Sequence, residues 1–268
     1  MTETAPSSNR FAPFLDELAD AAAAAIMPHF RQGFAVDNKL ETGFDPVTIA
    51  DRNGESAMRT LINGTYPDHG ILGEEHGPEK LDADHVWVLD PIDGTRAFIT
   101  GLPTWGTLIG LRSAGTPSLG MMVQPYIGER YAGDCKQAWY NGPLGTRTLK
   151  ARTCSRLEDA AIFTTTPFLF NDTERAAFDR VEASARLSRY GTDCYAYCMV
   201  AAGQGDAVIE SGLQAYDIVA LVPIIEGADG VVTTWTGGSP ADGGQILASG
   251  DPRLHDRLLR ELSRVGTP

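Results

Sequence analysis

Hydrophobic residues recur at helical spacing in two segments near the start of the chain. Residues 1–10 are polar and lie before the first of them. Steps of three and four residues then predict an amphipathic helix that ends near Phe30, with apolar positions at Phe11, Phe14, Leu18, Ala22, Ala25 and Ile26. A second helical pattern runs from about Arg52 to Ile62 and stops at Asn63-Gly64. The chain therefore begins with two predicted helices.

Short apolar runs follow, and the first two end directly in acidic residues. Ile71-Leu72-Gly73 leads into Glu74-Glu75, and Val86-Trp87-Val88-Leu89 leads into Asp90. Side chains at the ends of strands project from a rigid scaffold, which is a common way to build a site. Four more strand-like runs, spaced by glycine and proline turns, predict an antiparallel meander: Thr107–Leu111, Leu119–Gln124, Arg130–Gly133 and Ala138–Tyr140.

From about residue 157 the predicted strands alternate with helices, which is typical of a layered α/β arrangement. The strands are Ala161–Thr165, Ala207–Glu210, Val231–Trp235 and Gln245–Ala248. The helices are Thr173–Ala185, Asp193–Ala202, Ile218–Gly227 and Leu254–Val265. We therefore predict the α/β (α+β) class, with an N-terminal lobe over residues 1–156 and a C-terminal lobe over residues 157–268, packed as one unit.

Composition and charge exclude several classes of protein. The 268 residues include 22 Lys and Arg against 35 Asp and Glu, a formal net charge of −13, which excludes a general nucleic-acid binder. With 43% apolar residues the chain is not a disordered one. The apolar stretch Ala21–Met27 is too short to span a bilayer, so no membrane role is expected. Without a secretory signal or paired CxxC cysteines, a cytoplasmic location is expected.

The segment from Trp87 to Thr95 carries the most chemical information. Two acids three residues apart, as in Asp90 and Asp93, occur about four to five times by chance at this acid content. The context makes the pair informative, because an apolar strand precedes it and Gly94 and Thr95 follow it at a predicted helix start. Two carboxylates, the carbonyl of Ile92 and two backbone amides can bind a hard cation and a phosphate side by side.

The sequence excludes several other kinds of phosphate-handling and metal-binding motif. The extra residue between the two acids does not match an aspartyl-phosphate phosphatase, and the spacing does not match an EF-hand. Walker A and GxSxG motifs are missing. Two further acids have a second interpretation as helix caps: Asp217 before Ile218, and Asp193 before the helix that ends at Ala202.

Four motifs together resemble the inositol monophosphatase family of magnesium-dependent, lithium-sensitive phosphomonoesterases. They are Asp45-Pro46-Val47-Thr48 with Asp51, Gly73-Glu74-Glu75, Leu89-Asp90-Pro91-Ile92-Asp93-Gly94-Thr95, and Tyr216-Asp217. The resemblance implies a layered α/β/α/β/α sandwich, two or three Mg²⁺ ions and commonly a homodimer. It also implies that Mg²⁺ is held by Glu74, Asp90, the carbonyl of Ile92, Asp93 and Asp217. Glu74 with Thr95 would activate a water, Asp45 would support Thr95, and the amides of Gly94 and Thr95 would take the phosphate.

The resemblance also addresses the substrate. It implies contacts to the substrate body from Gly191, Thr192, Asp193 and Glu210, beside those of Asp93, Gly94, Thr95 and Asp217. The segment around Asp193 is similar to the branch that hydrolyses L-histidinol phosphate, and its carboxylate suits the cationic leaving group of that ester. Inositol-1-monophosphatase is the alternative, and a nucleotide 3′-phosphatase is a weaker one. A noncatalytic metal- or phosphate-binding protein is the hypothesis from a different class.

Overall fold

Two large β-sheets, separated and flanked by helices, form the fold in the computed structural model, which describes residues 9–32, 37–38 and 46–263. The helices are α1 Ala12–Ile26, α2 Ile49–Thr65, α3 Thr95–Ile99, α4 Asp172–Glu182, α5 Asp193–Ala201, α6 Ala215–Ile218, α7 Leu221–Gly227 and α8 Pro252–Leu262, with short 3₁₀ turns η1 Met27–His29, η2 Leu157–Asp159 and η3 Pro167–Leu169. None of the described helices combines the length and the apolar character that crossing a membrane requires.

The first large sheet has eight strands in the order β10-β9-β8-β7-β6-β5-β3-β4, and the second has five in the order β12-β11-β13-β15-β14. The bounds are β1 Asp37–Asn38, β2 Pro46–Val47, β3 Gly70–Gly73, β4 Gly77–Glu79, β5 His85–Asp93, β6 Gly106–Ser113, β7 Thr116–Gln124, β8 Glu129–Gly133, β9 Ala138–Gly142, β10 Gly145–Thr148, β11 Ala161–Thr164, β12 Leu187–Tyr190, β13 Ala207–Leu213, β14 Val231–Thr234 and β15 Gly244–Ser249. Strands β5 to β10 run antiparallel in sequence order, which confirms the predicted meander.

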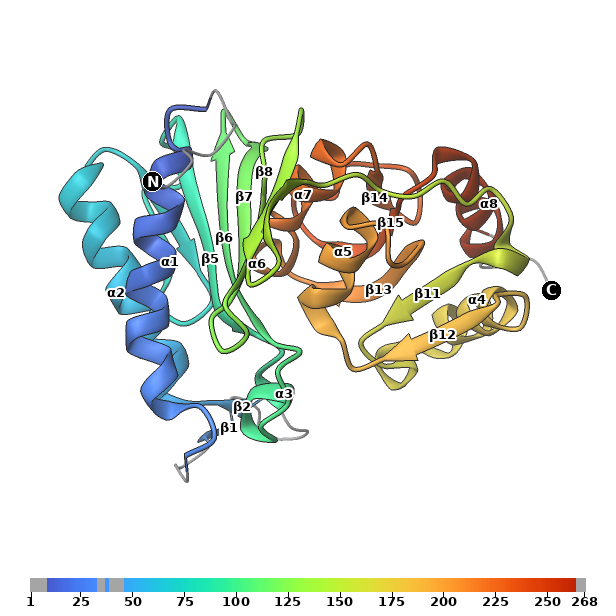
Figure 1. Ribbon diagram of the computed structural model, residues 1–268, viewed down its shortest axis with the longest axis horizontal. Helices are drawn as coiled ribbons and strands as arrows, with labels where there is room; N and C mark the ends of the chain where they lie inside the picture. Colours follow the sequence, from blue (N-terminus) through green and yellow to red (C-terminus); the bar gives the residue numbers. More distant parts are fainter. Residues whose placement is uncertain (1–8, 33–36, 39–45, 264–268) are drawn as a thin grey trace.

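The helices form three layers around these two sheets (Figure 1). Helices α1 and α2 cover one face of the eight-stranded sheet and share its first core cluster. Helices α5, α6 and α7 lie between the two sheets, and α4 and α8 cover the outer face of the five-stranded sheet. This order confirms the predicted α/β/α/β/α sandwich.

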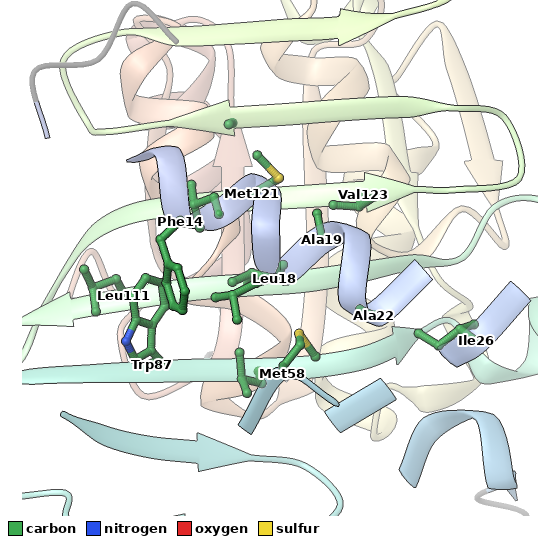
Figure 2. Close-up of a cluster of buried hydrophobic side chains, with 14 of the residues drawn as sticks. Phe14, Leu18, Ala19, Ala22, Ile26, Met58, Trp87, Leu111, Met121 and Val123 are labelled. Atoms are coloured by element: carbon green, nitrogen blue, oxygen red, sulfur yellow. The ribbon is translucent and has the colours of Figure 1, made fainter. Parts of the chain in front are cut away.

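The amphipathic pattern at the start of the chain forms α1 as predicted. Figure 2 shows Phe14, Leu18 and Ile26 on the helix face that meets the sheet, beside Trp87 and other apolar side chains of β5, β6 and β7. Leu18 and Trp87 are fully buried. Burial of a side chain such as Leu18 contributes about 2 kcal/mol, so this face anchors the first helix layer on the sheet that carries β5.

The structure corrects several predicted element boundaries. The helix predicted over Ile218–Gly227 begins only at Leu221, as α7, and Ile218 is instead the last residue of a separate short helix, α6. Pro223, the third residue of α7, has no N–H to donate to the carbonyl of Val219, so the helix is interrupted at Val219 and Ala220. Helix α2 continues through Asn63-Gly64 to Thr65, where the amide of Tyr66 caps it. The sequence pattern missed the strands β4, β10 and β12, because they are short edge strands without an alternating apolar face.

Candidate active site

Two parallel strands deliver the first pair of acids to one edge of the eight-stranded sheet. Strand β3 pairs with β5 so that Gly73 lies opposite Leu89, and the amide of Glu74 donates to the carbonyl of Leu89 at 3.2 Å. Glu74 therefore follows the end of β3 beside Asp90. The prediction that these two apolar runs are strands leading into acids is confirmed.

A bulge in β5 places Asp90 and Asp93 on the same side of the strand. Strand side chains alternate between faces, so residues three apart point to opposite sides in a regular strand. The register with β6 shifts between these two acids, and the carbonyl of Pro91 in the bulge accepts from the hydroxyl of Thr107 at 2.8 Å. The irregular backbone therefore lets both carboxylates enter one site.

Asp217 joins this pair from α6, the short helix that packs against β5 and β6. One oxygen each from Asp90, Asp93 and Asp217 lies within 4.8 Å of the others. Asp217 is also the third residue of α6, where its carboxylate accepts from the amide of Gln214 at 2.6 Å. The alternative interpretation of Asp217 as an N-cap is wrong in position, because Gln214 is the N-cap, but the carboxylate does support that helix start.

Burial, and then the charges of neighbouring acids, raise the pKa values of all three carboxyls. Desolvation raises the pKa of Asp90 well above its usual range, and the charges of Glu74, Asp93 and Asp217 raise it further. Desolvation, and then the charge of Asp193, raise the pKa of Asp93 to about 7. Desolvation and the charge of Asp93 raise the pKa of Asp217. Within the described part of the chain, no lysine or arginine forms a salt bridge with these three acids, so a bound cation would supply the missing charge.

The acids open into a cavity of about 260 Å³. It is lined by Glu74, Asp90, Ile92, Asp93, Gly94, Thr95, Arg96, Thr165, Leu169, Asp193 and Asp217. Eight of the predicted site residues are in this lining. Gly191, Thr192 and Glu210 are not, although they lie close to residues that are, and Asp45 lies outside the described residues.

Gly94 gives the cavity floor its shape. Its φ of +86° is a left-handed conformation that glycine adopts without steric cost. A Cβ at this position would lie 3.2 Å from the side chain of Asp193, so the backbone turn and that carboxylate are in direct contact. Thr95 follows as the first residue of α3, and its hydroxyl donates to the carbonyl of Ile92 at 3.1 Å. The turn between β5 and α3 is therefore held by the same residues that the motif predicts.

Asp193 does not act as a helix cap. It is the first residue of α5, with Thr192 at the N-cap, and no side-chain hydrogen bond caps this helix. Its φ of +41° is unusual for a residue other than glycine. Desolvation raises its pKa to about 6, against the opposing effects of a hydrogen bond with Thr165 and the charge of Arg96. The structure thus places the Asp193 carboxylate in the cavity.

Glu210 lies behind the cavity wall instead of in it. Its carboxylate accepts from the amide of Thr165 at 2.6 Å and from the hydroxyl of Thr164 at 3.2 Å. The side chain is buried, and desolvation raises its pKa to about 8. In this arrangement Glu210 positions Thr165, which does line the cavity.

Sequence reasoning missed Arg96, Thr165 and Leu169 in the cavity lining, and it missed the buried Glu55. Thr165 follows the end of β11 within the polar run Thr164-Thr165-Thr166, which is the one sequence signal that could have identified it. Glu55, buried on α2, accepts from the amide of Glu75 at 2.7 Å and pairs with Arg59. It therefore fixes the turn that carries Glu74, a role that no local motif indicates.

Three comparisons with known proteins agree with this fold. The model of the inositol monophosphatase family matches residues 9–267. The chain is 42% identical over 266 residues to the chloroplastic bifunctional phosphatase IMPL2 of Arabidopsis thaliana, covering 95% of this chain and 75% of that protein. It is 31% identical to the histidinol-phosphatase of Chlorobaculum parvum, covering 91% and 93%. It superimposes on an inositol monophosphatase from Zymomonas mobilis with a TM-score of 0.84 and 38% identity, covering 95% and 99%.

A layered α/β sandwich with a carboxylate-lined cavity between strand ends and helix starts defines the class: a phosphatase that hydrolyses phosphate monoesters. The chain belongs to the inositol monophosphatase family. The resemblance seen in four sequence motifs is therefore confirmed, and it extends over nearly the whole chain.

Proposed function

We propose that this phosphatase is magnesium-dependent and hydrolyses L-histidinol phosphate to L-histidinol and phosphate. The observation that carries the choice of substrate is the Asp193 carboxylate, which lies in the cavity against the turn at Gly94. The histidinol-phosphatase of Chlorobaculum parvum among the relatives supports the same choice.

The residues present fit Mg²⁺ by the chemistry of their donor atoms. Glu74, Asp90, the carbonyl of Ile92, Asp93 and Asp217 offer only oxygen ligands, which this ion prefers. Burial and the neighbouring acids raise the pKa values of Asp90 and Asp217, and among the described residues no lysine or arginine forms a salt bridge with either, so a divalent cation suits the charge of this cluster. When bound, Mg²⁺ supplies charge neutralisation for the phosphate and makes a coordinated water more acidic.

The remaining groups of the site position the reactants. Glu74 and Thr95 would orient the attacking water, and the Glu74 carboxylate would accept its proton. The glycine at position 94 lets the backbone approach the phosphate closely, so that the amides of Gly94 and Thr95 can donate to its oxygens. A hydrolysis of this kind proceeds by direct attack of water and needs no covalent intermediate on the protein.

The leaving group would meet Asp193, with Arg96, Thr165 and Leu169 around it. L-Histidinol carries an ammonium group and an imidazole, and the carboxylate of Asp193 would pair with one of them. Glu210 would act through Thr165, because its carboxylate holds the amide of that residue.

Inositol 1-phosphate is the second candidate substrate. The match to the Zymomonas mobilis inositol monophosphatase at 38% identity favours it, and a single carboxylate at Asp193 can also accept from a hydroxyl of inositol. The homodimer that the resemblance implies remains a prediction, for which light scattering on the purified protein is the measurement.

The experiment compares kcat/KM for histidinol phosphate and inositol 1-phosphate, with saturating Mg²⁺, in the wild type and in the Asp193→Asn variant. Asparagine tolerates the left-handed conformation of residue 193, so this substitution removes the charge and retains the backbone. Loss of one charge-assisted contact should lower kcat/KM for histidinol phosphate about 10- to 100-fold. The value for inositol 1-phosphate should change less than about threefold, because its hydroxyls can also bind the amide.

The matched control is Asp172→Asn. Asp172 is also the first residue of a helix, α4, but it is exposed and outside the cavity lining. This control should leave both substrates unchanged. An equal loss on both substrates in Asp193→Asn, or a wild type that prefers inositol 1-phosphate, would reject histidinol phosphate as the substrate.

A further inference from the structure

A buried carboxylate with three tyrosine partners lies away from the acids of the cavity. Glu129, at the start of β8 and 9% exposed, accepts from the hydroxyl of Tyr140 at 3.0 Å and from that of Tyr131 at 3.3 Å. The hydroxyl of Tyr195 donates to the same carboxylate. Burial and the Glu129 charge raise the pKa values of these tyrosines, so the hydroxyls remain protonated donors.

The three tyrosines differ in the element that carries them. Tyr131 is on β8 and Tyr140 is on β9, both in the same sheet as Glu129. Tyr195 is on α5, the helix between the two sheets (Figure 1). The Tyr195–Glu129 bond is therefore the one among the three that ties α5 to the eight-stranded sheet.

The start of α5 has a direct contact with the acidic cluster. The amide of Cys194 donates to a carboxylate oxygen of Asp93 at 2.6 Å, and Asp193 lies against Gly94. This helix start lacks a side-chain cap and includes the unfavourable φ of Asp193. A strained segment of this kind persists when surrounding contacts hold it in place.

We propose that Tyr195, through its bond to Glu129, is a positioning residue that holds the start of α5 so that the Cys194 amide orients the Asp93 carboxylate for Mg²⁺. The inference rests on the Mg²⁺ site of the proposed function. Tyr195 itself is two residues beyond Asp193 and is not among the residues that line the cavity. If the three tyrosines contribute only to stability, removing any one of their hydroxyls should have the same effect on Mg²⁺ affinity.

The test is Tyr195→Phe with Tyr140→Phe as the matched control. Both variants remove one hydroxyl from the same carboxylate and retain the aromatic ring. Mg²⁺ binding is measured by calorimetry on the substrate-free protein, and the Tm of each variant is recorded. Mutating a residue that hydrogen-bonds to a metal ligand commonly weakens metal affinity by about 10- to 100-fold. Tyr195 does not bond to Asp93 itself but supports the helix start that does, so Tyr195→Phe should weaken Mg²⁺ affinity by about 3- to 10-fold. Tyr140→Phe should stay within about twofold of the wild type.

A double variant separates a path through Glu129 from an independent effect of Tyr195. In a Glu129→Gln background, Tyr195→Phe should weaken Mg²⁺ binding by clearly less than it does alone, because the two substitutions remove the same contact. Equal Mg²⁺ affinities for Tyr195→Phe and Tyr140→Phe, with similar losses of Tm, would overturn the proposal. Absence of Mg²⁺ binding in the wild type would instead reject the proposed metal site, which keeps the two failures distinct.

Discussion

Asp206 and Asp90 are both buried, but the groups that surround their carboxylates carry opposite charges. Asp206, 1% exposed, accepts from the Nε of Arg152 at 2.7 Å and from the amide of Ala161 at 2.7 Å. Asp90, 2% exposed, accepts from the amide of Ile92 and is surrounded by further acids. A buried carboxylate is ordinarily paired with a cation. Asp206 is therefore neutralised within the protein, whereas Asp90, Asp93 and Asp217 form no salt bridge with a described lysine or arginine, which supports the cation site proposed above.

The largest expected effect comes from removing one charge of the cluster. Asp93→Asn should lower kcat/KM by more than about 100-fold, because mutating a residue that merely hydrogen-bonds to a metal ligand already costs up to about 100-fold. The same variant should have a higher Tm than the wild type in the absence of Mg²⁺, because it removes a repelled, desolvated charge. Phosphate-release assays and thermal denaturation are the measurements. Unchanged phosphate release would show that Asp93 is not a metal ligand.

Asp206→Asn should have the reverse profile and serves as the control for Asp93→Asn. Losing charge-assisted bonds to Arg152 and Ala161 should lower the free energy of unfolding by about 1 to 3 kcal/mol. This loss of stability should be smaller than for a fully buried ion pair, because the side chain of Arg152 is partly exposed. Urea denaturation measures the loss, and calorimetry should find the same Mg²⁺ affinity as in the wild type. A stable Asp206→Asn with weakened Mg²⁺ binding would contradict the contrast between the two acids.

Glu210 gives the most specific test, because it is buried with neutral hydrogen-bond partners and its expected effect is confined to the pH dependence of stability. Its pKa is raised from 4.5 to about 8 in the folded protein, so the folded state binds a proton that the unfolded state releases. Its contribution to stability is therefore complete below pH 4.5 and is lost as the pH rises through about 8.

The Glu210→Gln variant should flatten this dependence by at most about 1.4 kcal/mol per pH unit. Gln can keep both contacts, with its oxygen accepting from Thr165 and its amide donating to Thr164. Urea denaturation without Mg²⁺ across the pH range is the measurement. An identical slope in the variant would assign the pH dependence to other groups.

Much of the fold was predictable because its signals are local. The helical period of α1, the strand runs of the meander and the alternation in the second half all depend on neighbouring residues. The errors fell where local signals are weak or conflict. Pro223 lies inside an apolar run and divides α6 from α7, and β12 is a four-residue edge strand with no buried position.

The site residues were predictable to the extent that a motif contains them. Asp90, Asp93, Gly94 and Thr95 are contiguous, and the structure places all four in the cavity lining. Glu210 was predicted to contact the substrate, whereas the structure places it behind Thr165. Whether a side chain such as Glu210 lines the cavity or lies behind it depends on contacts between segments far apart in the chain, which a single sequence does not indicate.

The sequence by itself determined the family, the acidic residues and the strands that deliver them, because each depends on short-range pattern and residue type. Tertiary structure alone decided three things: that the β5 bulge turns Asp90 and Asp93 to one side, that α6 brings Asp217 within 4.8 Å of them, and that Tyr195 reaches Glu129 across the layers. The bulge depends on the pairing of β5 with β6, and the contacts of Asp217 and Tyr195 join residues far apart in the chain, which meet because the two sheets pack around α5 and α6.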